Sequence, residues 1–265
     1  MVELILTYLA VGAVAGVLAG LLGVGGGLVI VPMMVFCLTR EGVSEMNIMQ
    51  IALGTSMASI VFTAVSSFWA HHRRGAVQWD VVRSIVPGIL LGTFLGSCVA
   101  SRLSTGFLKV FFVVFLYYVA LQLFLNKKPK PSRELPGEAG MFAVGNAIGA
   151  VSSFVGIGGG SLSVPFMIWC NVGVHHAIGT SAAIGFPIAI AGTVGYIVNG
   201  IHAAGLPNPS LGYIYLPALA GIVSASVLTA PLGARLAHRL PVDKLKRGFA
   251  ILLFAMGTRM LMGLL

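Results

Sequence analysis

The sequence predicts an all-α integral membrane protein made of two repeats inserted with opposite topology. Of its 265 residues, 57% are hydrophobic and 9% are charged, whereas a soluble domain carries about 25% charged residues. Apolar segments of about 20 residues, the length of a membrane-spanning helix, recur along the whole chain. A glycine-rich motif also occurs once in each half. These features exclude a secreted enzyme, a nucleic-acid binder and a disordered tail protein.

The internal duplication is visible in two motifs. Residues 16–32 read GVLAGLLGVGGGLVIVP, and residues 149–165 read GAVSSFVGIGGGSLSVP, so the two stretches align without a gap. A Gly-Thr-Ser triplet follows in each half, at residues 54–56 and 179–181. A shared order of motifs predicts that both halves fold on one plan.

The last apolar segments of the two halves also correspond, because Leu108-Lys109 begins one and Leu245-Lys246 begins the other. The chain therefore divides into a first transmembrane repeat over residues 1–125, a polar linker over 126–139 and a second transmembrane repeat over 140–265. Each repeat is expected to hold a glycine-broken helix pair or hairpin and three long transmembrane helices. The expected segments are about 4–22, 24–38, 46–70, 79–101 and 107–125, then 140–157, 160–171, 175–198, 213–234 and 244–264.

Loop charges predict the topology. The loops at 71–74 and 127–133 hold six Lys or Arg, against two in 102–109, and 235–247 holds five. Basic loops stay in the cytoplasm, so the linker is expected there. Residues 235–247 share that side only if each glycine-broken pair returns to the side where it began. Both termini then lie outside, the second repeat is inverted, and the protein lies in the cell inner (cytoplasmic) membrane.

The two glycine turns, at residues 23–27 and 156–160, are the predicted substrate site. Helices that restart after such turns present free backbone N–H groups and the positive end of a helix dipole, which bind anions without a basic side chain. The alternative is that these glycines only permit close helix crossing. The substrate-binding residues predicted at the turns are Gly25, Gly26 and Gly27, then Gly158, Gly159, Gly160 and Ser161.

The Gly-Thr-Ser triplets are predicted to supply hydroxyl donors to the same anion. Their residues are Thr55 and Ser56 in the first half and Thr180 and Ser181 in the second. The alternative is that these hydroxyls bond to carbonyls of their own helix. Glycines spaced four apart, at 12, 16 and 20 and at 88, 92 and 96, are interpreted as packing faces.

Several residue types argue against other chemistry. Every Asp and Glu lies near a segment end or in a loop, so a cation carrier or a buried carboxylate relay is disfavoured. Adjacent histidines such as His71 and His72 point in different directions from a helix, and the three cysteines form no CxxC pair. We therefore expect no metal, no cofactor, no catalytic residue and no nucleic-acid partner.

At the paired glycine motifs and Gly-Thr-Ser triplets, the sequence resembles the sulfite exporter family, also called TauE/SafE. The resemblance covers nearly the whole chain. It implies a transporter that moves small sulfur-containing oxyanions, such as sulfite, sulfoacetate or another organosulfonate, across the cytoplasmic membrane, as an exporter. The alternatives are a membrane-embedded enzyme acting on a lipid or sulfur compound, and an anion channel. The residues leave the substrate, the direction, proton coupling and the oligomeric state open.

Overall fold

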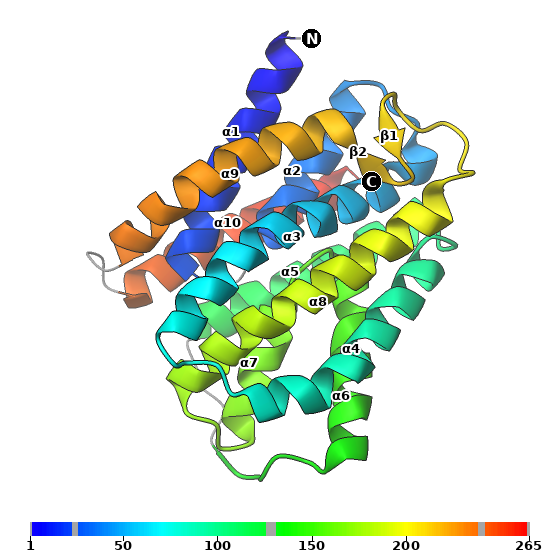
Figure 1. The fold of residues 1–265 in the computed structure, drawn as a ribbon. Coiled ribbons are helices and arrows are strands. Elements are labelled where there is room, and N and C mark those ends of the chain that lie inside the picture. The colour runs from blue at the N-terminus through cyan, green and yellow to red at the C-terminus, as the bar shows by residue number, and fades with distance from the viewer. Residues whose placement is uncertain (1, 23–25, 126–130, 238–241, 264–265) are drawn as a thin grey trace.

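The fold repeats one order of helices in the two halves of the chain (Figure 1). A computed structural model describes residues 2–22, 26–125, 131–237 and 242–263. The first half contains α1 (Val2–Leu22), α2 (Gly27–Arg40), the 3₁₀ turn η1 (Glu45–Asn47), α3 (Ile48–Arg73), α4 (Trp79–Ala100) and α5 (Thr105–Leu125). The second contains α6 (Glu138–Val155), α7 (Gly160–Trp169), α8 (Val174–Gly200), β1 (Ser210–Leu211), β2 (Ile214–Tyr215), α9 (Leu216–Ala237) and α10 (Val242–Met262).

The helices confirm an all-α membrane protein. Within the described residues, six helices are long and apolar enough to cross a bilayer. Their outward side chains are large and apolar, as on α5, where Phe107, Val110 and Val114 are each at least half exposed. A surface of this kind is stable in lipid and unfavourable in water. The six are Glu45–Arg73, Trp79–Ala100, Thr105–Leu125, Glu138–Val155, Val174–Gly200 and Leu216–Gly233.

Each glycine-broken pair returns to the side where it began, as the charge argument requires. In the first half, the Tyr8 hydroxyl near the start of α1 donates to Glu41, just after α2, at 2.5 Å. In the second half, the N–H groups of Ser132 and Arg133, before α6, donate to the Trp169 carbonyl at the end of α7. α7 has 10 residues, or about 15 Å, half of a bilayer core of about 30 Å. The α6–α7 pair is therefore a hairpin with a short return arm.

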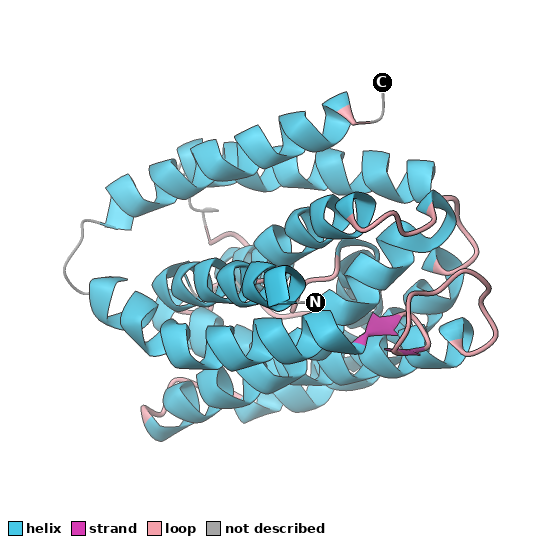
Figure 2. Ribbon diagram, turned by 90° about the horizontal axis from the view of Figure 1, so that it is seen from above, coloured by secondary structure: helices cyan, strands magenta, loops and turns pink. Residues whose placement is uncertain are grey.

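Loops gather on two sides of the molecule. The "linker side" contains residues 74–78, 131–137 and 170–173, where the His176 ring nitrogen lies 3.3 Å from the Ala76 carbonyl. The "hairpin side", named after the short β-hairpin of β1 and β2, contains residues 41–47, 101–104 and 201–215. There the Asn47 amide donates to the Ala204 carbonyl at 2.8 Å. Figure 2 shows the two strands among the loops of this second side.

The two halves exchange equivalent contacts. α1 packs along α9, α6 packs along α4, and α3 and α8 lie side by side through the centre (Figure 1). A side chain at Gly12 would meet the backbone of Ile222, and one at Gly88 would meet the backbone of Phe142. The glycine faces on α1 and α4 therefore allow close backbone approach, as the sequence predicts.

The short β-hairpin is the main element that the sequence analysis missed. Ser210 pairs with Tyr215 and Leu211 with Ile214, so α9 begins at Leu216 and not near residue 213. Gly212, at the turn, has a φ of 56° and packs against the Ile197 backbone at the end of α8. Two residues per strand are too few to produce the alternating pattern by which strands are predicted.

Candidate functional site

The second glycine turn reverses the chain between α6 and α7. Gly156 caps the end of α6 with a φ of 68°, and Gly159 precedes α7 with a φ of 75°. Both angles are in the left-handed region that glycine adopts without steric cost. The turn lies near the middle of the two longest helices, because Gly158 packs against Ile60 of α3 and Gly185 of α8.

Four backbone N–H groups at this turn have no acceptor among the described residues. The N–H groups of Leu162 and Ser163 both donate to the Gly159 carbonyl. Within the part of the chain that the structure describes, the N–H groups of Gly158, Gly159, Gly160 and Ser161 donate to no protein atom. The first N–H groups of a helix have no partner within it and are a common place for an anion to bind, so this row of donors at the start of α7 indicates a place for an acceptor that is not part of the protein.

Two serine hydroxyls add to this row of donors. Ser152 on α6 is fully buried and Ser161 on α7 is 8% exposed, and neither hydroxyl oxygen has a partner among the described residues. The Ser152 hydroxyl lies beside Gly159, 3.4 Å from the place where a side chain there would begin. Ser163, also buried, is already bonded to Ser181 at 2.7 Å. The second turn thus concentrates unsatisfied polar groups in a few residues.

The first glycine turn differs from the second. Gly26 has a φ of −68°, an ordinary helical value that any residue adopts, whereas the φ of 75° at Gly159 favours glycine. Gly27 packs directly against the carbonyl of Gly156, which brings the two turns together. Gly23 and Gly25 lie outside the described residues.

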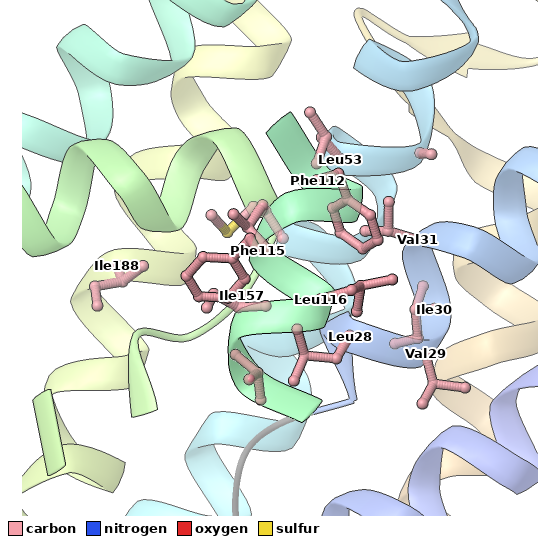
Figure 3. Close-up of a cluster of buried hydrophobic side chains, with 14 of the residues drawn as sticks. Leu28, Val29, Ile30, Val31, Leu53, Phe112, Phe115, Leu116, Ile157 and Ile188 are labelled. Atoms are coloured by element: carbon pink, nitrogen blue, oxygen red, sulfur yellow. The ribbon is translucent and has the colours of Figure 1, made fainter. Parts of the chain in front are cut away.

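The start of α2 is apolar where the start of α7 is polar. Leu28 and Ile30 are buried in a cluster with Phe112 and Leu116 of α5 (Figure 3). In the motif alignment, these two residues stand opposite Ser161 and Ser163, and Ala19 stands opposite Ser152. The two turns are therefore not equivalent sites, and the polar groups belong to the second.

The triplet threonines join the two halves. The Thr55 hydroxyl on α3 accepts from the Tyr215 N–H at the start of α9, at 3.0 Å. The Thr180 hydroxyl on α8 accepts from the Gln78 N–H at the start of α4, at 2.9 Å. Both threonines are fully buried. The sequence suggested that these hydroxyls donate either to the anion or to carbonyls of their own helix, and neither role describes this contact. That the two threonines take part in substrate binding stays a prediction.

The triplet serines, by contrast, contact the second glycine turn. The Ser56 hydroxyl donates to the Gly156 carbonyl at 2.8 Å. Ser181 reaches the turn through Ser163, whose hydroxyl lies 3.1 Å from the Gly159 carbonyl. The structure therefore brings both serines to the turn and holds the threonines at the helix junctions.

Thr55→Val and Thr180→Val are expected to lower the thermal stability of the protein. Each change leaves a backbone N–H of the opposite half without its acceptor, which costs about 1–3 kcal/mol. Thr→Ser at the same positions keeps the hydroxyl and should retain most of the stability. Melting temperatures in detergent test this, and valine variants that melt like wild type would contradict the junction role.

The comparisons with known proteins agree with this architecture. The profile of the sulfite exporter TauE/SafE family matches residues 8–260. The chain belongs to the TauE/SafE family. A probable membrane transporter protein of Haemophilus influenzae is 41% identical over 98% of this chain and 99% of its own length. The probable membrane transporter protein YunE of Bacillus subtilis is 31% identical over 71% of this chain and 77% of its own length. No solved structure matches. This TauE/SafE member is a multi-pass membrane transporter.

Ser152 is the site residue that the sequence analysis of this TauE/SafE protein overlooked. A comparison of the two repeats position by position would have found it, since the second repeat has Ser152 where the first has Ala19. The histidine pairs lie elsewhere, at the end of α3 and the start of α8 on the linker side. There His176 contacts the loop before α4, so these residues belong to a helix junction.

Proposed function

We propose that this protein is a secondary transporter that exports small sulfur-containing oxyanions across the cytoplasmic membrane. The observation that carries the proposal is the row of unpaired backbone and serine donors at the second glycine turn, between α3 and α8. An oxyanion accepts several such bonds at once, and charge-assisted bonds are about twice as strong as neutral ones. The family's description as sulfite exporters supports sulfite as substrate, and sulfoacetate or another organosulfonate would present similar sulfur-bound oxygens to the same donors.

In the proposed site, the N–H groups of residues 158–161 and the hydroxyls of Ser152 and Ser161 bind the anion. Ser56 and Ser181 support the turn from α3 and α8. Of the other residues predicted from the sequence, Gly26 and Gly27 lie in the first turn, and Thr55 and Thr180 lie at the helix junctions. Gly25 lies outside the described residues. The site needs no metal and no cofactor.

We further propose that the two halves are inverted repeats that rock against each other to expose the site alternately. The exchanged contacts support this, because Thr55 bonds to Tyr215 just before α9 as Thr180 bonds to Gln78 just before α4. Tyr117 of α5 also stacks on Phe254 of α10, with ring centroids 4.9 Å apart, where the last helices of the halves cross. Transporters of this architecture bind substrate near the midplane, between the repeats.

This topology predicts that the linker side is cytoplasmic. In a background without Cys37, Cys98 and Cys170, Ser132→Cys should react with an impermeant thiol reagent only after the cells are permeabilised. Glu45→Cys, exposed on the hairpin side, should react in intact cells. Labelling of Ser132→Cys alone in intact cells would show that the orientation is the reverse of the one proposed. Labelling of both positions in intact cells would refute the placement of the two sides on opposite faces of the membrane.

Flux through purified protein in liposomes tests the function itself. Sulfite, sulfate, thiosulfate and sulfoacetate are offered in turn, with and without a pH gradient. We expect saturable flux of a sulfur-containing oxyanion, with the anion recovered chemically unchanged. Non-saturating conductance would indicate a channel, and a changed product would indicate an enzyme. A dependence on the pH gradient would establish proton coupling.

A further inference from the structure

Lys109 is a basic residue on the buried face of a membrane-spanning helix. It follows Thr105 by one turn of α5 and is 8% exposed. Thr105, Leu108, Phe112 and Leu116 share its face and are all buried. A lysine near the end of a spanning helix usually lies on the lipid face and extends toward the membrane surface. The side chain of Lys109 is buried within the protein instead.

The ammonium group of Lys109 has no partner in the described part of the chain. No hydrogen bond or ion pair joins it to a carboxylate, a carbonyl or a hydroxyl there. Its nitrogen is also absent from the fully enclosed polar atoms without a partner, so it keeps some accessible surface. A charge in such a place is costly unless water or an anion contacts it. The position therefore indicates an aqueous path on the inner side of α5.

The neighbouring polar side chains leave this charge unneutralised. Thr105 donates to the Met46 carbonyl at 2.9 Å. Gln50 donates to the Leu103 carbonyl at 2.8 Å. Both groups satisfy backbone atoms on the hairpin side and carry no charge. Lys109 is thus the cationic member of a polar group at that end of α5.

The same face of α5 leads from Lys109 to the glycine turns. Further along α5, Phe112, Phe115 and Leu116 lie in one buried cluster with Leu28, which follows the first turn, and Ile157, which is part of the second (Figure 3). Three residues along a helix correspond to about 4.5 Å. Lys109 therefore lies between the hairpin side and the proposed anion site.

The second half holds a lysine at the corresponding position. Leu245-Lys246 aligns with Leu108-Lys109, and Lys246 precedes the buried residues Phe249 and Ala250 by three and four positions. α9 begins beside the β-hairpin and crosses to the start of α10, so Lys246 lies toward the linker side. Each half thus provides one lysine, and the two lie toward opposite sides.

We propose that Lys109 forms a separate binding position for the transported anion, at the entrance on the hairpin side. The inference rests on the proposed function, since the anion that reaches the second glycine turn passes this charge first. A positive charge in a narrow path raises the local concentration of anions and their rate of entry, and added salt weakens this effect.

The test replaces the charge and then restores it chemically. In the cysteine-free background, Lys109→Cys is alkylated in detergent with bromoethylamine, which adds a cationic group, or with iodoacetate, which adds an anionic one. Both thioether adducts are stable to sulfite, and each protein is freed of reagent and then reconstituted. Saturable sulfite flux is measured from each preparation. We expect the unmodified variant to show a KM at least about 10-fold above that of the lysine protein, as for loss of one charge-assisted bond. The cationic adduct should restore most of the loss, and the anionic adduct should deepen it.

Lys109→Arg and Lys109→Gln provide the matched comparison. The arginine variant should keep a low KM, while the glutamine variant should raise KM, keep kcat within about threefold and lose the sensitivity of KM to salt. Equal KM values for cysteine, both adducts and lysine would overturn the inference and leave the proposed function intact. If the lysine protein moves none of the oxyanions, the proposed function fails instead. Slower alkylation of Lys109→Cys by iodoacetate in the presence of sulfoacetate, which does not react with the reagent, would still establish the binding position, and an unchanged rate would refute it.

Discussion

Gly159→Val is expected to abolish anion transport. Gly159 has a φ of 75°, a conformation that is a severe outlier for a β-branched residue. Its side chain would begin 3.4 Å from the Ser152 hydroxyl and would meet Ile188 of α8. The substitution therefore displaces the unpaired donors as well as straining the turn. Loss of two charge-assisted bonds corresponds to a decrease of about 100-fold or more in affinity. The initial rate of sulfite flux into liposomes is the measurement.

Gly26→Ala is the matched control for this change. Gly26 has a φ of −68°, and an added methyl group would lie 3.1 Å from the Ile30 side chain and 3.4 Å from that of Ala15. The substitution should therefore leave the melting temperature nearly unchanged and reduce flux much less. If Gly159→Val transported as well as Gly26→Ala, the second turn would have no role in binding.

Gly92→Leu is expected to prevent folding. Gly92 lies where α4 crosses α6, and its side chain would begin 2.6 Å from the Cα atom of Asn146. Overpacking against side chains costs about 1–3 kcal/mol, and here the obstacle is backbone, which cannot adopt another rotamer. The variant should give little monodisperse protein after extraction in detergent, and its remaining folded fraction should melt far below wild type.

Gly106→Leu is the control for Gly92→Leu. Gly106 is in the first turn of α5, and nothing lies within 4 Å of the place where its side chain would begin. This variant should give a normal yield and a nearly normal melting temperature. Equal yields from the two leucine variants would show that the α4–α6 crossing tolerates a side chain, contrary to the packing described above.

Much of the fold was predictable because it depends on patterns that repeat along the chain. The glycine motifs and loop charges predict two broken pairs that return to their starting sides, and both do. The glycine faces were also predictable, because spacing by four places residues such as Gly88 and Gly92 on one side of a helix. The β-hairpin was not, since its strands have two residues each.

The sequence predicted which motifs form the candidate site, but it did not predict the backbone conformation or the hydrogen-bond partners of the individual residues in them. The sequence indicates two similar glycine turns, but φ at Gly26 and at Gly159 differ in sign. The role of Thr55 depends on a backbone N–H that lies 160 positions away in the chain. A pattern confined to one helix contains no information about such a partner.

Anion-dependent thermal stabilisation tests the central claim most directly, which is that the second glycine turn binds the anion. Melting temperature is measured against sulfite concentration for wild type, for the double variant Ser152→Ala with Ser161→Ala, and for Ser97→Ala. Ser97 is also buried, but its hydroxyl donates to the Phe94 carbonyl of its own helix. A ligand at about 100 times its Kd stabilises the native state by about 2.7 kcal/mol. The account predicts that all three proteins melt alike without sulfite and that the double variant alone needs at least about 10-fold more sulfite for the same rise. The same concentration dependence in all three would contradict it.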